Sequence, residues 1–146
     1  MREIKKVGVL GAGTMGSGIA QNFASAGYKV VLFDVQENAL NNATNIIEKY
    51  NSFYVKKEII SQEESDKMIE DILFTSKLED LHDCDLIVEA IIEVLEVKRD
   101  VFGKLDKICK PETIFASNTS SLSISEISTS TDRTDRFIGM HFFNPV

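Results

Sequence analysis

Three glycines near the amino end of the chain have the spacing of a loop that holds a phosphate group. Gly11, Gly13 and Gly16 follow a short apolar run and lead directly into a predicted helix. The first glycine permits a tight turn, the second lets the backbone approach a pyrophosphate, and the third lets the helix lie close against the strand. Unpaired N–H groups at the positive end of that helix would then face the diphosphate.

An acidic residue stands where such a loop needs one. Asp34 ends a second apolar run and lies 18 positions after Gly16, close to the roughly 20 expected for a carboxylate that binds the adenosine ribose. A carboxylate at this place repels a 2′-phosphate, and residues 35–37 contain no arginine, so NAD is favoured over NADP. An ordinary strand–helix–strand unit without a ligand is the alternative.

The whole chain excludes several classes of protein. Its 146 residues, 43% of them apolar, suit one globular domain, and a net charge of −7 without a basic block argues against nucleic acid as a partner. No apolar run reaches the ~18 residues of a membrane span, and the first strand follows Met1 too closely for a leader peptide. Cys84 and Cys109 lack CxxC spacing, as is typical of a reducing compartment, so we expect a cytoplasmic protein. His82 and Asp83 precede Cys84 without a further ligand cluster, so no metal is expected.

Strands and helices alternate along the chain, which predicts an α/β fold. We expect strands at 6–10, 29–34, 72–76, 84–90, 113–117 and 137–142, and helices at 17–24, 36–57, from Ser61 onwards, and at 95–109. Such alternation predicts a Rossmann-type, doubly wound parallel sheet with ligands at the carboxyl ends of its strands.

A helical hairpin is predicted after the second strand. Apolar residues recur at helical spacing from Ala39 to Tyr54, and Ser61 with Glu64 forms a capping-box pattern at the start of a second helix. An excursion of this length often reaches over a ligand. Lys49, Lys56 and Lys57 lie on the hairpin, although spacing alone favours a solvated basic face.

The segment after the fifth predicted strand is rich in hydroxyl side chains. From residue 117 to 134, 11 of 18 residues are serine or threonine, a composition typical of a flexible linker. Its position at the carboxyl end of a strand, and the apolar face formed by Leu122, Ile124 and Ile127, favour a structured active-site loop with a short helix.

Four blocks together resemble one family. They are residues 11–16, residues 85–90 with Glu93 and Lys98, residues 115–122, and residues 136–145. Over essentially its whole length the chain resembles the NAD-binding domain of L-3-hydroxyacyl-CoA dehydrogenases, the bacterial 3-hydroxybutyryl-CoA group included. The first block is shared with other hydroxyacid dehydrogenases, whereas the last two are specific.

The resemblance implies a role for each matching residue. His141 is the general base that takes the 3-hydroxyl proton as hydride leaves C3, Ser120 hydrogen-bonds the substrate oxygen, and Lys56 or Lys57 meets the CoA moiety. A histidine with a pKa near neutrality suits that proton transfer, although a core histidine on the last strand is the alternative from the residue alone. The implied cofactor contacts come from Gly11, Gly13, Thr14, Met15, Gly16, Asp34, Ala90, Glu93, Lys98, Asn118 and Asn144.

The resemblance also implies parts that this chain does not contain. The family continues past Val146 with a glutamate that orients the histidine and with a helical second domain that closes the substrate cleft and forms the dimer. We therefore expect the dehydrogenase of fatty acid or butanoate metabolism to be a homo-oligomer at full length, and this chain to turn over weakly. A stand-alone NAD-binding or interaction module without turnover is the second hypothesis.

Overall fold

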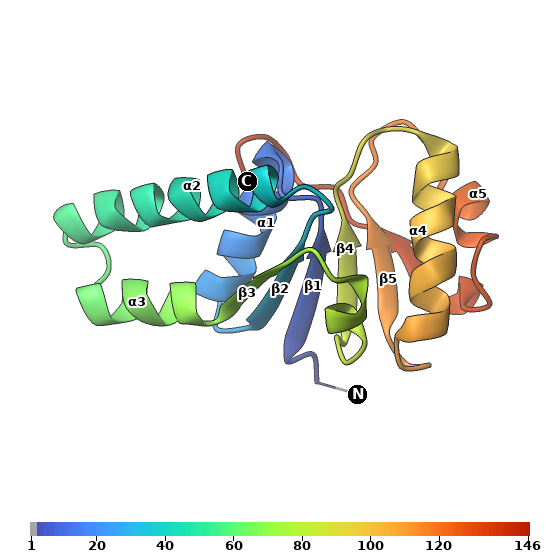
Figure 1. Cartoon of the computed structure of the whole chain (residues 1–146), viewed down its shortest axis with the longest axis horizontal. Coiled ribbons are helices and arrows are strands. Elements are labelled where there is room, and N and C mark those ends of the chain that lie inside the picture. The colour runs from blue at the N-terminus through green and yellow to red at the C-terminus, as the bar shows by residue number, and fades with distance from the viewer. Residues whose placement is uncertain (1–2) are drawn as a thin grey trace.

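A six-stranded parallel sheet forms the centre of the computed structural model, which describes residues 3–146 (Figure 1). The strand order is β3-β2-β1-β4-β5-β6, so the chain builds one half of the sheet outward from β1 and then returns to start the other half at β4. The strands are β1 Lys6–Leu10, β2 Lys29–Phe33, β3 Ile72–Thr75, β4 Leu86–Glu89, β5 Ile114–Ser117 and β6 Phe137–Gly139. This order confirms the Rossmann-type fold predicted from the sequence.

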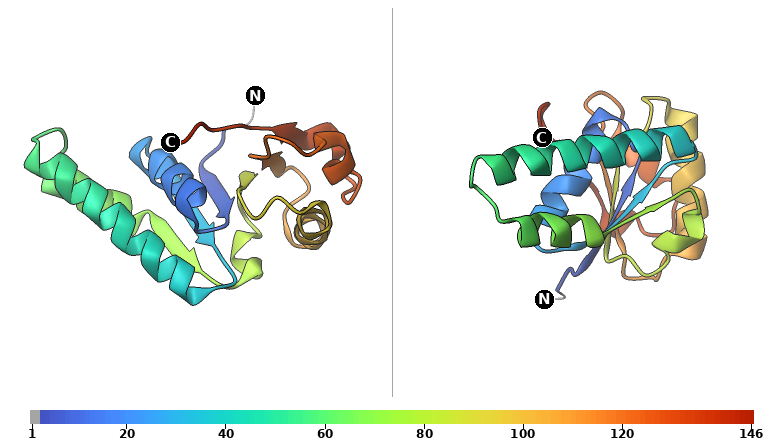
Figure 2. Two further views of the ribbon diagram at one scale, coloured as in Figure 1. Left: turned by 90° about the horizontal axis from the view of Figure 1, so that it is seen from above. Right: turned by 60° about the vertical axis from the view of Figure 1, so that its left-hand side comes forward.

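Helices cover both faces of the sheet. They are α1 Thr14–Ser25, α2 Glu37–Lys56, α3 Gln62–Glu70, α4 Leu95–Ile108 and α5 Ile124–Ser128, with 3₁₀ turns at Leu78–Leu81 and Thr134–Arg136. Figure 2 shows α4 and α5 on the side of the sheet opposite to α1, with the carboxyl-terminal segment passing back towards α1. No helix within residues 3–146 is long and apolar enough to cross a membrane.

The inner strands β2, β1, β4 and β5 are buried on both faces, because successive side chains point to opposite sides and helices cover both. Val7 and Val9 of β1 belong to the core under α1, whereas Leu10 belongs to the core on the α4 side. On that second side, Phe102 of α4 packs edge-on against Phe137 with ring centroids 4.6 Å apart. The two cores fix the carboxyl ends of the strands, where the candidate site lies.

The predicted hairpin is present and extends from the body of the domain (Figure 1). Its capping box is complete, since Ser61 Oγ accepts a hydrogen bond from the Glu64 N–H and Glu64 Oε2 accepts one from the Ser61 N–H. Only the first part of α2 reaches the core, through Leu40, Ala43 and Ile47. The aromatic side chains further along α2 are more than a third exposed, so the apolar stripe of the sequence is only partly a core stripe.

The last strand is shorter than predicted. β6 ends at Gly139 and not at residue 142, because its neighbour β5 ends at Ser117. The Met140 N–H still reaches the Ser117 carbonyl, but the Phe142 N–H is bonded by the side chain of Asn118 in place of a strand carbonyl. His141 therefore lies beyond the strand and is exposed, which corrects the expectation that it sits on the strand.

Candidate functional site

The glycine loop joins β1 to α1 with the geometry that its spacing predicts. Gly11 has φ of +95°, and a Cβ there would lie 2.6 Å from the carbonyl oxygen of Ala90. A Cβ on Gly16 would lie 1.6 Å from the carbonyl oxygen of Gly11, so the helix could not approach the turn. A Cβ on Gly13 would meet nothing within 4 Å, so the loop is open at that point.

The first turn of α1 offers its N–H groups to a ligand. Gly13 is the N-cap and has no side chain, so no side chain caps the helix, and the first turn contains no acidic residue. The first N–H groups of a helix have no partner within the helix, and they carry its positive end. The loop can therefore bind an anion, because no side chain of the helix cap or of an acidic residue in the first turn takes that place.

Asp34 lies directly beside this loop. Its Oδ2 accepts a hydrogen bond of 2.8 Å from the Ala12 N–H, and its Oδ1 accepts one of 2.9 Å from the Gln36 N–H. These bonds hold the carboxylate at the carboxyl end of β2, next to the turn after β1. The structure thus brings Asp34 and the glycine loop together, as a ribose-and-pyrophosphate site requires.

A second group of predicted residues converges at the carboxyl ends of β4, β5 and β6. They surround a cavity of about 300 Å³, which we call the edge cavity. It is lined by Met15, Ala90, Ile91, Glu93, Lys98, Asn118, Ser120, His141, Phe142, Phe143 and Asn144. The structure therefore gathers in one place eight residues that the sequence analysis assigned to cofactor or chemistry.

Lys98 and its partners form an ion cluster beneath the edge cavity. The Lys98 ammonium lies 2.5 Å from Glu89 Oε1 and 2.9 Å from Glu93 Oε1, and its side chain is 1% exposed. Partial burial raises the pKa of Glu93, but hydrogen bonds from Thr119, Lys98 and Ser121 outweigh it and hold that pKa below its ordinary value. Glu93 is the member of the cluster that is partly open to solvent.

Sequence reasoning gave no role to Glu89 or Thr119. Glu89 is fully buried, and besides Lys98 it accepts hydrogen bonds from the Ile91 N–H and the Ser117 hydroxyl. A glutamate at the end of an otherwise apolar strand was the available signal, since an isolated buried carboxylate is costly unless it is paired. Thr119 lay unmarked in the hydroxyl-rich loop, whose structured state and short helix α5 are confirmed.

His141 is held by Asn118. The ring atom Nδ1 lies 3.2 Å from the Asn118 carbonyl oxygen, and the ring packs edge-on against Phe143. Asn118 also donates its N–H to the Glu89 carbonyl and accepts the Phe142 N–H with its side chain. The exposed Ser120 hydroxyl forms no hydrogen bond to any other residue in the range 3–146. A proton acceptor and a free hydroxyl thus share one cavity wall.

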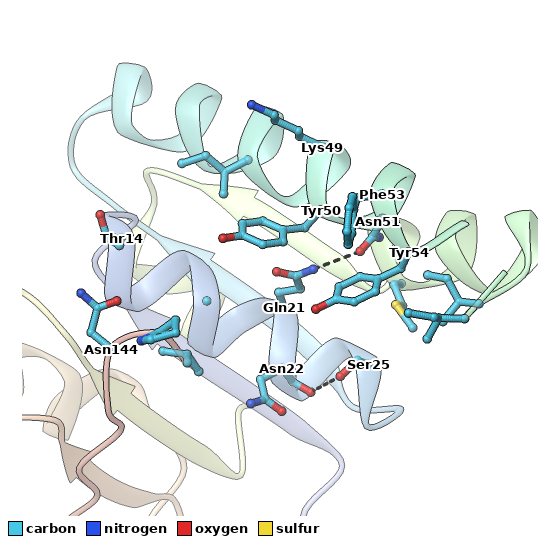
Figure 3. Close-up of a pocket in the computed structure, with 17 residues that line it drawn as sticks. Thr14, Gln21, Asn22, Ser25, Lys49, Tyr50, Asn51, Phe53, Tyr54 and Asn144 are labelled. Carbon is cyan, nitrogen blue, oxygen red and sulfur yellow. Dashed lines mark hydrogen bonds between the residues drawn. The ribbon is translucent and has the colours of Figure 1, made fainter. Parts of the chain in front are cut away.

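A larger hollow, which we call the hairpin groove, lies between α1 and the α2–α3 hairpin (Figure 3). It measures about 1030 Å³, and its lining includes Ile46, Tyr50, Phe53, Tyr54, Ile59, Lys49, Thr14, Gln21, Asn144 and Val146. A hydrogen bond from Gln21 to the buried Asn51 joins α1 to α2 beneath it (Figure 3).

The two lysines predicted to meet CoA lie outside both hollows. Lys56 and Lys57 are exposed at the end of α2, and the Lys57 ammonium lies 5.7 Å from the centroid of the Phe53 ring. Within residues 3–146, no three His, Cys, Asp or Glu side chains are grouped so that they could hold a metal ion.

Comparison with known proteins identifies the domain type. Residues 6–146 match the family described as "3-hydroxyacyl-CoA dehydrogenase, NAD binding domain". Two curated relatives named 3-hydroxybutyryl-CoA dehydrogenase are similar: one from Bradyrhizobium diazoefficiens is 48% identical over 98% of this chain, and one from Clostridioides difficile is 46% identical over 97%. The chain spans about half the length of these relatives, 49% and 50% respectively.

A solved structure supports the same assignment. The crystal structure of 3-hydroxybutyryl-CoA dehydrogenase from Escherichia coli superposes on 99% of this chain with a TM-score of 0.95 at 35% sequence identity, and 30% of that longer chain is covered. The similarity therefore extends over both the glycine loop and the edge cavity.

Proposed function

Because the chain belongs to the family of NAD-binding domains of 3-hydroxyacyl-CoA dehydrogenases, we propose that it serves hydride transfer between C3 of a 3-hydroxyacyl-CoA and NAD. The 3-hydroxybutyryl-CoA class is the substrate that the curated relatives suggest. The observation that supports the catalytic part best is the convergence of His141, Ser120 and Glu93 in one cavity.

The open groups of the domain fit an NAD molecule. The glycine loop offers helix N–H groups and the space above Gly13 to the pyrophosphate, and Asp34 offers a carboxylate to the adenosine ribose. Since the sheet order reverses between β1 and β4, a dinucleotide held at β1 and β2 extends its other half over β4. That half meets the edge cavity, where Ala90, Glu93, Asn118 and Asn144 line the wall.

His141 is the proposed general base. Its Nδ1 lies 3.2 Å from a carbonyl oxygen, which can only accept, so in the neutral ring the proton is on Nδ1 and the lone pair is on Nε2. Nε2 can then take the proton of a 3-hydroxyl group, and the Ser120 hydroxyl can hydrogen-bond the same substrate oxygen. Bound NAD supplies the hydride acceptor.

The remaining parts of the proposal concern the acyl-CoA carrier and the longer protein. Lys56 or Lys57 would pair with the phosphates of CoA from the exposed end of α2. We also propose that residues 1–146 act together with a second, helical domain that closes the substrate cleft and forms the dimer, since the curated relatives are about twice as long.

The proposal is tested in two steps on the purified chain. NADH binding is followed by calorimetry, and acetoacetyl-CoA is then added while NADH absorbance is recorded, with His141→Ala as the matched variant. We expect both proteins to bind NADH equally, and the parent chain alone to oxidise it, at a very low rate. Absence of NADH binding would contradict the whole proposal, and equal turnover in the two proteins would contradict the role of His141. Binding without turnover in either would favour the non-catalytic NAD-binding module.

A further inference from the structure

Three charged side chains form a connected unit, the buried triad, made of Glu89, Lys98 and Glu93. Glu89 and Lys98 are 0% and 1% exposed, so neither can reach a ligand in this conformation without rearrangement. Glu93 and Lys98 both line the edge cavity, and the Glu93 side chain, 44% exposed, is the part of the triad that is open to solvent.

Both carboxylates of the triad accept hydrogen bonds from their neighbours. Ser117 Oγ accepts the Thr119 N–H at 3.3 Å and donates its own proton to Glu89 Oε2 at 2.5 Å. Thr119 Oγ1 accepts the Leu122 N–H at 3.0 Å and lies 2.6 Å from Glu93 Oε2, so the threonine proton points to Glu93. Both acids accept hydrogen bonds from their neighbours, and the formal charges of two carboxylates and the Lys98 ammonium sum to one net negative charge.

Lys98 has no proton left for a ligand. An ammonium has three N–H donors, and its nitrogen contacts Glu89 Oε1, Glu93 Oε1 and the Ile91 carbonyl oxygen at 3.4 Å. Lys98 therefore holds Glu93 in place, while Glu89 holds Lys98. The carboxylate of Glu93 is the group that a ligand in the edge cavity would meet.

We propose that Glu89 is a specificity-determining residue that, through the charge of the buried triad, favours the oxidised, cationic nicotinamide ring over the neutral reduced ring. This inference rests on the proposed function, which brings the nicotinamide half of NAD over β4. NAD⁺ and NADH share the same adenosine and pyrophosphate, so the charge of the nicotinamide ring is the main electrostatic difference through which the site can bind one more tightly than the other. In a partly buried site a unit charge acts over several ångströms with little screening.

The test is the ratio of the dissociation constants of NAD⁺ and NADH, measured by calorimetry on the parent chain and on Glu89→Gln. Glutamine keeps the shape of the side chain: its oxygen can accept from Lys98 and Ile91, and its amide can donate to Ser117. We expect the ratio to rise about fivefold, mainly through weaker NAD⁺ binding, because only the cationic ring loses an attraction. Damage to the fold would weaken both forms alike.

Two further variants isolate the charge. Glu96→Gln removes the same formal charge from the exposed first turn of α4 and is expected to leave the ratio within about twofold of the parent value. The double variant Glu89→Gln with Lys98→Met restores a net charge of −1 and is expected to return the ratio towards the parent value. It also keeps the test informative if the single variant is poorly folded.

An unchanged ratio in a folded Glu89→Gln chain, or a double variant that keeps the shifted ratio, would overturn this inference. A parent chain that binds neither NAD⁺ nor NADH would instead contradict the proposed function, so the two failures are distinguishable.

Discussion

The edge cavity and the hairpin groove differ in how their walls are held. Around the edge cavity Glu93, Lys98 and Asn118 are tied by hydrogen bonds to the ends of β4 and β5, although the exposed Ser120 hydroxyl is free within the part of the chain that the structure describes. No buried side-chain N or O atom of residues 3–146 lacks a hydrogen-bond partner. The groove is lined by tyrosine, phenylalanine and isoleucine side chains that are more than a third exposed. The difference indicates that the strand ends hold the side chains of the edge cavity in fixed positions, whereas the hairpin provides an exposed apolar surface that extends from the domain.

The two hollows still share one wall residue. Asn144 lines both, because the segment after β6 passes from the edge cavity towards α1 (Figure 2). Variants in the edge cavity and in the hairpin groove, compared for stability and NADH affinity, therefore test whether the two hollows are independent.

The largest expected effect comes from breaking the buried triad. Lys98→Met leaves the fully buried Glu89 without its counter-ion, and we expect the free energy of unfolding to fall by about 3–5 kcal/mol. Tyr50→Ser in the half-exposed wall of the groove should cost less than about 1 kcal/mol. Urea unfolding of both variants measures the difference, and equal losses would show that the two walls are held alike.

A second variant separates binding from folding. Gly13→Val places a side chain in the space above the glycine loop, and we expect NADH affinity to fall at least about 100-fold. Stability should stay within about 1 kcal/mol, because Gly13 has φ of −75° and its Cβ would meet no neighbour. Calorimetry and urea unfolding give the two readouts. Phe53→Ser in the groove is the control that should leave NADH affinity unchanged, and a large loss there would contradict the division of tasks.

The comparison also explains which parts of the molecule the sequence predicts. The glycine loop, the capping box at Ser61 and the buried strands are set by short-range rules of turn geometry and apolar burial, and the structure confirms all of them. The hairpin shows the limit of such rules. Periodicity predicts a helix over residues 36–57, and α2 indeed spans Glu37–Lys56, but the pattern does not say that only its first part has a core to pack against.

The site shows a similar limit. Eight residues that line the edge cavity were assigned roles through motifs. Glu89 lies within the block 85–90 but received no role, because its partners Lys98 on α4 and Ser117 on β5 come from other elements. The length of β6 depended on where the neighbouring strand ends, which no pattern within residues 137–142 records. The sequence of a single segment thus does not record where the neighbouring strands and helices that contact it begin and end.

A third variant tests the proposed contact between Asp34 and the adenosine ribose of the cofactor. Asp34→Asn keeps an oxygen for the Ala12 N–H but removes the negative charge beside the glycine loop. We expect the preference for NADH over NADPH to fall about tenfold, since a 2′-phosphate no longer meets a carboxylate. Competitive calorimetry with both cofactors measures the ratio. If the parent chain already binds NADPH as tightly as NADH, the assignment of Asp34 is wrong.

The smallest expected effect lies in the hairpin. Ser61→Ala removes the N-cap hydrogen bond of α3, which should lower the free energy of unfolding by about 1 kcal/mol and leave NADH affinity unchanged. Ser52→Ala, on the exposed side of α2, is the matched control and should be near neutral. A weaker affinity for NADH in Ser61→Ala would show that the stability of the hairpin is coupled to cofactor binding at the glycine loop.

Asn118 has a consequence for how the domain opens. Its N–H, carbonyl and side-chain oxygen connect the end of β4 to His141 and to the Phe142 N–H, so detaching the histidine segment breaks two of these hydrogen bonds. In hydrogen exchange, the amides of Asn118 and Phe142 should therefore be protected nearly as long as those of β4 and β5, whereas the free end of the hairpin exchanges through small local openings. The cavity wall and the sheet would then constitute one cooperative unit, and the lifetime of the site would equal the lifetime of the fold.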